Sequence, residues 1–436
     1  MNNAEKLIAR RHAIVPEGMG MFTPLTIASG SGAQIKDVDG KTYIDFAGGI
    51  GVLNAGHCPR PVVEAITRQA KLLTHSCFPV AIYEPYVELA EMLAKLFPHG
   101  KKTKVMLTNS GVEAVENAVK IARQATGRPG IICFTGGFHG RTLLGMTLTS
   151  KTGYKIGCGP FAPEIYRLPF PDYYKRGDGM TLKKFVAREL QAFEEALHTT
   201  VDASQVAAVV LELVQGEGGF VVAPKDWVVG LAKICRKHGI RLVVDEVQTG
   251  FGRTGAWSAY SQYGIVPDIS TWAKSLGSGM PIGAVIGRAD VMDKTTKGTL
   301  GGTYLGNPVA CAAAIATIQY MKKIRITEKG KRVGKTVLKF FEKLKKECPS
   351  IGDVRGLGAM TAFELVKNGD PHQPDADLAK KLIHACAENG LLIITAGTGG
   401  NVIRVLSPLV ISDSQLRRGL EILRKQLLRL THTTGK

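Results

Sequence analysis

Long apolar runs are missing from this 436-residue chain, although 44% of its residues are hydrophobic. Glycine and proline interrupt the sequence throughout, so no stretch reaches the roughly 18 consecutive apolar residues that a membrane-spanning helix needs. We therefore expect a globular protein without a membrane segment. The N-terminal sequence carries charges where a secretory signal has its apolar stretch, so no export signal is predicted and a cytoplasmic location is expected.

Paired cysteines are missing as well. The eight cysteines are scattered, without a CxxC pair or a zinc-like spacing, so we expect reduced thiols and no bound metal. Acidic residues are outnumbered by basic ones, which gives a net charge of +19. The basic residues gather in 322–346 and 417–429 without the regular aromatic interleaving of a base-stacking surface, which favours a solvated basic face over a nucleic-acid partner.

The order of predicted elements indicates an α/β fold. A chain of this length is usually organised around more than one core, so two lobes are expected. Helices alternate with short apolar strands between residues 86 and 245, which is typical of a mostly parallel sheet covered by helices. Two of the strands lack polar alternation, as expected of strands buried on both faces. The predicted elements are helices 86–96, 111–126 and 226–238 and strands 104–108, 131–134, 206–213 and 241–245.

Further elements are predicted before and after this sheet in the sequence. Residues 34–46 predict a hairpin, because Asp39-Gly40 is a favoured two-residue turn between β-rich segments. After residue 308, two long helices are expected to lead to a second lobe. The predicted elements of this region are helices 309–323, 327–347, 376–389 and 413–430 and strands 359–365, 391–395 and 402–405.

The residues that follow each strand are candidates for a site, because open α/β sheets bind ligands beyond the carboxyl ends of their strands. Ser110 and Gly111 follow strand 104–108 and begin a helix, whose free N–H groups and dipole suit a phosphate. Ser110 is equally compatible with an ordinary helix N-cap. Phe138 and Arg141 follow strand 131–134. They can stack on a flat cofactor and bind a carboxylate, or serve as a core aromatic and a surface arginine.

A carboxylate and a lysine follow the next strands. Asp245 ends an apolar strand, where a buried acid needs a cationic or hydrogen-bonded partner. It can pair with a protonated ring nitrogen or cap a helix. Lys274 interrupts the mostly apolar stretch 267–277. Most lysines are solvated, but a lysine beside a phosphate site and such an aspartate supplies the nitrogen to which an aldehyde cofactor bonds.

Together these segments resemble the class III, or ω-amino acid, aminotransferases, which have the type I fold of pyridoxal-phosphate enzymes. The resemblance covers nearly the whole chain and is greatest to the bacterial 4-aminobutyrate aminotransferases. It implies a large domain, residues 61–315, with a mostly parallel central sheet, and a smaller α+β domain formed by residues 1–60 and 316–436. The stretches that carry it are YIDFAGGIGVLNAGH (43–57), NSGVEAVENAVKIAR (109–123), GFHGRT (137–142), VQGEGG (214–219), DEVQTGFGRTG (245–255), AKSLGSGMPIGAVIGR (273–288), GGTYLGNP (301–308) and GDVRGLGAM (352–360).

The resemblance implies a bound pyridoxal 5'-phosphate (PLP) and a role for each matching residue. Lys274 would hold the cofactor and move a proton in the reaction, and Asp245 would pair with the ring nitrogen. Thr303 of the neighbouring subunit would reach the phosphate, so a homodimer, or a dimer of dimers, would be part of the active site. The other cofactor-binding residues would be Ser110, Gly111, Val112, Phe138, His139, Glu212, Val247 and Gln248.

Substrate recognition is implied at four further positions. Arg141 would bind the carboxylate that the amino donor and the 2-oxo acid share. Arg404 would bind the α-carboxylate of glutamate or 2-oxoglutarate, and Glu217 would neutralise Arg404 when 4-aminobutyrate leaves it unpaired. Ile50 would line the pocket. The expected reaction is a ping-pong transfer of the ω-amino group of 4-aminobutyrate, or a similar ω-amino acid, to 2-oxoglutarate, giving succinate semialdehyde and glutamate.

Other activities share this fold. Ornithine, acetylornithine, lysine ε- and 5-aminovalerate aminotransferases use much of the same machinery, so they stay open as alternatives. An amino-acid racemase is less favoured, because Arg141 is present in the HGR position. A basic nucleic-acid-binding protein, a different class altogether, would bind in a salt-sensitive manner and would show no cofactor absorbance.

Overall fold

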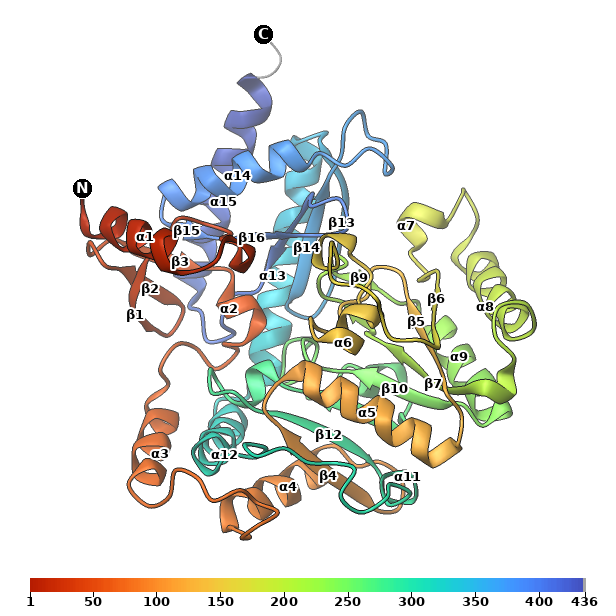
Figure 1. Cartoon of the computed structure of the whole chain (residues 1–436). Coiled ribbons are helices and arrows are strands. Elements are labelled where there is room, and N and C mark those ends of the chain that lie inside the picture. The colour runs from red at the N-terminus through yellow and green to blue at the C-terminus, as the bar shows by residue number, and fades with distance from the viewer. Residues whose placement is uncertain (434–436) are drawn as a thin grey trace.

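The computed structural model describes residues 1–433 and is built around a seven-stranded sheet (Figure 1). The strands run in the order β4-β12-β11-β10-β7-β5-β6. All neighbours pair in parallel except β12, which is antiparallel to β4 and β11. The mostly parallel sheet predicted from the sequence is confirmed. Its strands are β4 (Thr103–Thr108), β5 (Gly130–Phe134), β6 (Ile165–Leu168), β7 (Val206–Leu211), β10 (Arg241–Asp245), β11 (Ile269–Trp272) and β12 (Gly283–Arg288).

Strand β12 runs against its neighbours because its connection from β11 is short. Residues 273–282 form only one 3-10 turn, Lys274–Leu276, whereas a parallel return needs a crossover of a dozen or more residues. The antiparallel register places Gly283 opposite Thr108, at the end of β4. The loop that carries Lys274 is therefore held next to the start of α5 (Gly111–Thr126).

Side chains along the central strands alternate between two apolar cores, which explains why the strand sequences lack polar residues. Val210 and Val243 pack with the apolar face of α5, whereas Val209 and Val244 belong to the larger core on the other face. Figure 1 shows α5 lying across the sheet. The other helices of this region are α3 (Arg60–Ala70), α4 (Glu84–Leu96), α6 (Leu143–Leu148), α7 (Tyr173–Arg176), α8 (Leu182–Thr199), α9 (Lys225–His238), α10 (Tyr260–Tyr263), α11 (Ala289–Met292) and α12 (Pro308–Lys323).

Two four-stranded sheets are formed by the N-terminal and C-terminal segments. The first, β1-β2-β3-β15, combines β1 (Ile27–Ser31), β2 (Gln34–Asp37) and β3 (Thr42–Asp45) with β15 (Leu391–Leu392), which pairs in parallel with β3. The second, β13-β14-β17-β16, is antiparallel and contains β13 (Ile351–Leu357), β14 (Met360–Leu365), β16 (Ile394–Ala396) and β17 (Val402–Val405). The hairpin β8 (Val214–Gln215) and β9 (Val221–Val222) and the helices α1 (Asn3–Ile14), α2 (Gly48–Gly51), α13 (Ile326–Glu347), α14 (Ala376–Glu388) and α15 (Asp413–Thr433) complete the fold. The division at residues 60 and 315 stays a prediction.

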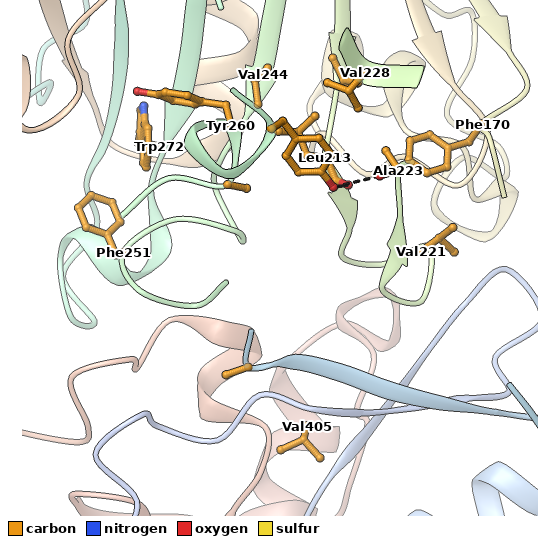
Figure 2. Packing of buried hydrophobic residues seen from close by; sticks show 14 of the residues in the cluster. Phe170, Leu213, Val221, Ala223, Val228, Val244, Phe251, Tyr260, Trp272 and Val405 are labelled. Carbon is orange, nitrogen blue, oxygen red and sulfur yellow. Dashed lines mark hydrogen bonds between the residues drawn. The ribbon is translucent and has the colours of Figure 1, made fainter. Parts of the chain in front are cut away.

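One apolar core joins the central sheet to the C-terminal sheet. Val244 of β10, Trp272 of β11 and Val405 of β17 belong to the same cluster of buried side chains (Figure 2). Tyr263 crosses this core, and its hydroxyl donates to the carbonyl oxygens of Leu213 and Ala223 at 3.3 and 3.1 Å. The strand ends that face the C-terminal sheet are thus fixed by continuous packing. No helix among residues 1–433 is long and apolar enough to cross a membrane.

Several local predictions need correction. The hairpin loop is one residue longer than the predicted Asp39-Gly40 turn, because the Asp37 N–H donates to the Lys41 carbonyl at 2.9 Å. The strand predicted at 206–213 ends at Leu211, and the strand predicted at 391–395 is divided into β15 and β16. Strand β13 was not predicted, because its half-buried residues include two glycines and show little apolar alternation. Helices α1, α3 and α8 also lay outside the predicted set.

Candidate active site

A cavity of about 490 Å³ lies at the carboxyl ends of the central strands. Its wall brings together twelve of the predicted site residues: Ser110, Gly111, Val112, Phe138, His139, Arg141, Glu212, Glu217, Asp245, Val247, Gln248 and Lys274. Most of these residues end or follow β4, β5, β7, β10 and β11 in the chain. The cavity therefore lies where open α/β sheets bind ligands, at the carboxyl ends of the strands. Among the described residues, no group of three or more His, Cys, Asp or Glu side chains could hold a metal ion.

The first turn of α5 forms one wall of the cavity. Ser110 is the N-cap of the helix, and its hydroxyl accepts the Glu113 N–H at 3.3 Å. Both interpretations of Ser110 therefore apply, because the same residue caps the helix and lines the cavity. Gly111 is needed for packing, since a Cβ at this position would come within 2.9 Å of a Val247 methyl group. Free N–H groups in this first turn make the wall suitable for an anion.

Asp245 and His139 form a buried pair opposite that wall. Nδ1 of His139 lies 2.8 Å from Oδ2 of Asp245, and their side chains are 1% and 4% exposed. Oδ1 of Asp245 accepts the Val247 N–H at 3.0 Å. Burial alone would lower the pKa of His139, but the hydrogen bond and charge of Asp245 outweigh it and raise that pKa. The raised pKa favours the protonated imidazolium of His139 beside Asp245.

Lys274 is partly buried and lines the cavity. Burial lowers the pKa of its ammonium group, and the nearby carboxylates Glu217, Glu212 and Asp245 only partly oppose that shift. The neutral amine is thus more accessible than in an exposed lysine. The backbone of Lys274 has φ 45°, a left-handed conformation that costs energy for a residue with a side chain and that is often found at functional positions.

Glu212 connects two segments of the cavity wall. Its carboxylate accepts the Phe138 N–H at 2.9 Å and the Gly216 N–H at 2.8 Å. Burial raises the pKa of Glu212 to about 7. The rings of Phe138 and Tyr154 pack edge to face, with their centroids 5.5 Å apart. Glu212 therefore holds the Phe138 segment and the segment before Glu217 in a fixed relation.

Arg404 lies behind Glu217. Nη1 of Arg404 is 2.7 Å from Oε1 of Glu217, and their side chains are 3% and 17% exposed. The same nitrogen donates to the Gly216 carbonyl at 3.2 Å, while Nε is buried without a hydrogen-bond partner among residues 1–433. Burial alone would raise the pKa of Glu217, but the Arg404 guanidinium outweighs it and lowers that pKa. An ionised Glu217 therefore neutralises a buried arginine.

The remaining predicted residues lie at the edge of the cavity or outside it. The Arg141 guanidinium is 4.4 Å from the centre of the Tyr154 ring. Ile50 has φ 63° and is 36% exposed. Thr303 is exposed and does not line the cavity of its own chain. The prediction that Thr303 serves a neighbouring subunit therefore stays a prediction.

Sequence reasoning missed part of the wall. Val52 and residues 279–282 line the cavity. Tyr154 ends a short 3-10 helix, Thr152–Tyr154, and contacts Phe138 and Arg141 of the wall, yet no motif or strand end marks it. Residues 279–282 belong to the motif 273–288. Their position between β11 and β12, shortly after Lys274, could have indicated that they line the site.

Known proteins provide an independent comparison. The chain matches the family described as aminotransferase class-III over residues 14–427. It is 47% identical over 415 residues to a probable 4-aminobutyrate aminotransferase of Bacillus subtilis, covering 95% of each chain. It is 45% identical over 420 residues to a 5-aminovalerate aminotransferase of Pseudomonas aeruginosa, covering 96% of this chain and 97% of that one. A PLP-bound amine transaminase from an uncultivated Pseudomonas species has a TM-score of 0.89 at 29% identity, over 96% and 97% of the two chains.

The fold and the comparisons define an aminotransferase. The chain belongs to the class III aminotransferase family, as its motifs predicted.

Proposed function

We propose that this enzyme moves the ω-amino group of 4-aminobutyrate to 2-oxoglutarate with PLP bound in the cavity. The observation that carries the proposal is the Lys274 amine, with its lowered ammonium pKa, lining one cavity with a helix start and the Asp245 carboxylate. The Bacillus subtilis relative, named a probable 4-aminobutyrate aminotransferase, supports the choice of donor. The products are succinate semialdehyde and glutamate.

The residues that line the cavity fit the chemistry of PLP. The first turn of α5, with Ser110, Gly111 and Val112, suits the phosphate. Asp245 suits a protonated ring nitrogen, and Phe138 and Val247 supply apolar contact for a ring. The buried Oε1 of Gln248 has no hydrogen-bond partner in the described part of the chain, and it suits a hydroxyl group. The bound cofactor supplies an aldehyde for the amino group and a ring that withdraws electrons from the reacting carbon.

Lys274 performs the acid–base work. Its lowered ammonium pKa lets the amine accept a proton from the substrate carbon and return it at another atom. His139 holds the Asp245 carboxylate in place through their 2.8 Å contact, and Glu212 fixes the segments that carry Phe138 and Gly216. These residues act by holding charges and positions constant while the proton moves.

Arg141, Arg404 and Glu217 let one cavity accept two kinds of substrate. Arg141 binds the carboxylate that 4-aminobutyrate and 2-oxoglutarate share. With 4-aminobutyrate, the Glu217 carboxylate stays on Arg404 as observed. With 2-oxoglutarate or glutamate, the second carboxylate replaces Glu217 at Arg404, so the buried guanidinium is paired in both half-reactions.

A homodimer with shared active sites is part of the proposal. Thr303 and Tyr304 are exposed on the segment 301–306, outside the cavity of their own chain. Placing Thr303 against the phosphate of a second subunit gives this exposed segment a function. A cytoplasmic location is likewise proposed.

The test of this function begins with Lys274→Ala. The wild type purified with PLP should absorb near roughly 420 nm, and an amino donor should bleach the band. The variant should bind cofactor and show no turnover, whereas turnover at the wild-type rate would contradict the assignment.

A second candidate function is transfer from 5-aminovalerate, because the Pseudomonas aeruginosa relative carries that name at 45% identity. A donor panel decides between them, with 4-aminobutyrate, 5-aminovalerate, β-alanine, ornithine, lysine and acetylornithine tested against 2-oxoglutarate. Slow turnover of 4-aminobutyrate beside fast turnover of another donor would overturn the proposed substrate and leave the class intact.

A further inference from the structure

The stretch 352–360 carries an arginine that the reaction described so far does not use. Arg355 lies on β13, with a side chain only 12% exposed. Its guanidinium contacts Oδ2 of Asp353 at 2.8 Å and Oε2 of Glu364 at 2.7 Å. Its Nε donates to the Gly219 carbonyl at 2.8 Å. The third contact reaches the segment that carries Glu217.

Strand register places Arg355 and Arg404 in one row of the C-terminal sheet. Arg355 of β13 is opposite Ala362 of β14, and Ala362 is opposite Arg404 of β17. Directly opposed residues of antiparallel strands point to the same face. Both guanidinium groups therefore reach the same segment, 216–219, from one sheet: Arg404 contacts its beginning and Arg355 contacts its end.

The backbone of this segment is fixed at further points. The Gly216 N–H donates to Glu212 at 2.8 Å, and the Glu217 carbonyl accepts the Gly397 N–H at 2.9 Å. Gly219 has φ +103°, and a Cβ there would come within 2.8 Å of a Val402 methyl group and 3.2 Å of Nη2 of Arg355. The Glu217 side chain is the part of the segment that can rotate.

We propose that Arg355 is a positioning residue that clamps the backbone of 216–219, so that Glu217 joins and leaves Arg404 by side-chain rotation alone. The inference rests on the proposed exchange of carboxylates at Arg404. A clamped backbone returns the Glu217 carboxylate to the same place in every cycle. Without the clamp, the segment moves and the pairing of Glu217 with Arg404 weakens.

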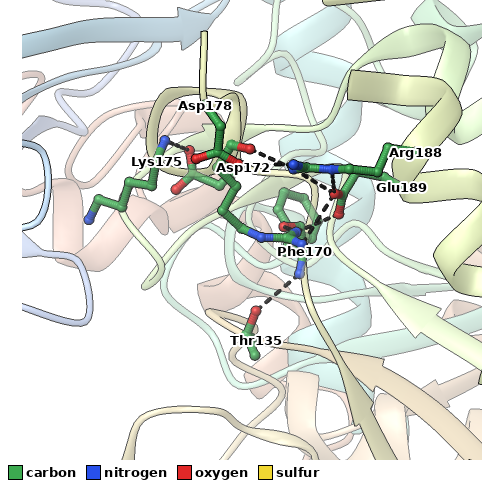
Figure 3. Close-up of polar contacts among 8 residues, drawn as sticks. Thr135, Phe170, Asp172, Lys175, Asp178, Arg188 and Glu189 are labelled. Atoms are coloured by element: carbon green, nitrogen blue, oxygen red, sulfur yellow. Dashed lines mark hydrogen bonds and ion pairs between the residues drawn. The ribbon is translucent and has the colours of Figure 1, made fainter. Parts of the chain in front are cut away.

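The charge of Arg355 is held by a wider network. Glu364, which is fully buried, also accepts a contact from Nζ of Lys175 on α7 at 2.7 Å. Asp172 caps the same short helix through the Lys175 N–H at 3.3 Å; Figure 3 shows these two residues beside the pair formed by Arg188 and Glu189. Removing the Arg355 charge would take one cationic partner from the buried Glu364 and from the half-buried Asp353, so the informative substitution keeps the charge.

The substitution that tests the clamp is Arg355→Lys. A lysine can stay with Asp353 and Glu364, but a single ammonium lacks the planar fork that also reaches the Gly219 carbonyl. We expect kcat/KM for 4-aminobutyrate, measured in the isolated donor half-reaction, to fall about tenfold, the effect of losing one hydrogen bond. The Kd of glutarate, a dicarboxylate that takes the place of Glu217 at Arg404, should not rise. An equal loss in both quantities, or no change in either, would overturn the proposal.

A second measurement needs no turnover. Amide hydrogen exchange of the peptide spanning 213–221, measured on the chain without cofactor, should be faster in Arg355→Lys than in the wild type, because the segment has lost an anchor. Unchanged exchange would overturn the clamp. The matched control is Arg176→Lys, since Arg176 also bonds a carboxylate, Glu189, and a backbone carbonyl, that of Phe170 at 2.8 Å. The control should leave exchange of 213–221 and the donor half-reaction unchanged.

The variant Glu217→Gln separates failure of this inference from failure of the proposed function. If Glu217→Gln impairs donor and dicarboxylate equally, the exchange of carboxylates at Arg404 is wrong. If it impairs only the donor while Arg355→Lys does not, the clamp alone is wrong. In the double variant with Glu217→Gln and Arg355→Lys, the second substitution should lower kcat/KM for 4-aminobutyrate little further, because both changes act on the pairing of Glu217 with Arg404. Full additivity would count against the clamp.

Discussion

Replacing Glu217 by glutamine should turn an enzyme for two kinds of substrate into one that prefers dicarboxylates. The substitution keeps the shape of the side chain and removes its charge. Arg404, 3% exposed and 2.7 Å from the Glu217 carboxylate, then has no anionic partner when 4-aminobutyrate is bound. A hydrogen bond to a charged group contributes about 1.5–3 kcal/mol, so kcat/KM for 4-aminobutyrate should fall about 10- to 150-fold.

Glutamate brings its own second carboxylate to Arg404, so its kcat/KM should change by less than about threefold or rise. The assay is stopped-flow measurement of the two donors separately, following cofactor absorbance without an acceptor. Glu347→Gln is the matched control, because Glu347 also contacts an arginine, Arg424, at 2.7 Å but lies on α13 outside the cavity wall. Equal losses for 4-aminobutyrate and glutamate would refute the reasoning.

Two other predictions concern the adjacent buried carboxylates of Asp245 and Glu246. Asp245→Asn removes the charge that His139 contacts at 2.8 Å, and the lost interaction is worth about 1.5–3 kcal/mol. The kcat at saturating PLP should therefore fall at least about tenfold. An unchanged kcat would contradict the role of Asp245. Burial raises the pKa of Glu246 to about 7 from 4.5. Between these pH values the folded state retains a proton that the unfolded state releases. The free energy of unfolding should therefore drop by up to about 3 kcal/mol as the pH rises from about 4.5 to 7. Urea-unfolding midpoints at pH 5 and pH 8 should show a smaller pH dependence in Glu246→Gln, and an equal dependence would disprove the assignment.

The sequence predicted the cavity wall well because its residues follow strands that were easy to recognise. The helix beginning at Gly111 and the strands ending at Asp245 and Val405 have the predicted bounds. Strong apolar runs and a helix with buried residues on one face define such elements locally. Once the order of elements indicates a mostly parallel sheet, the carboxyl ends of its strands must share one edge.

What the sequence did not predict depends on contacts between distant segments. Glu217 and Arg404 could be assigned only by resemblance, because the two members of the pair lie 187 positions apart in the sequence and neither is marked by local periodicity. Tyr154 lies in a single 3-10 turn, Thr152–Tyr154, that no local pattern marks. The function of Arg355 requires the register of β13, β14 and β17, and register is set by tertiary pairing that a single sequence does not display.

The parallel pairing of β3 with β15 constrains how the polypeptide is produced. Ile44 is opposite Leu391, so the ribosome must synthesise most of the chain before an early strand finds its neighbour. Long-range pairing of this kind is slow and leaves strand edges exposed meanwhile. A nascent chain released before residue 391 contains Lys274 and Asp245 but lacks Arg404. Chaperone dependence and degradation of truncated products are therefore expected to centre on β3, Thr42–Asp45, whose second neighbour in the sheet is synthesised late.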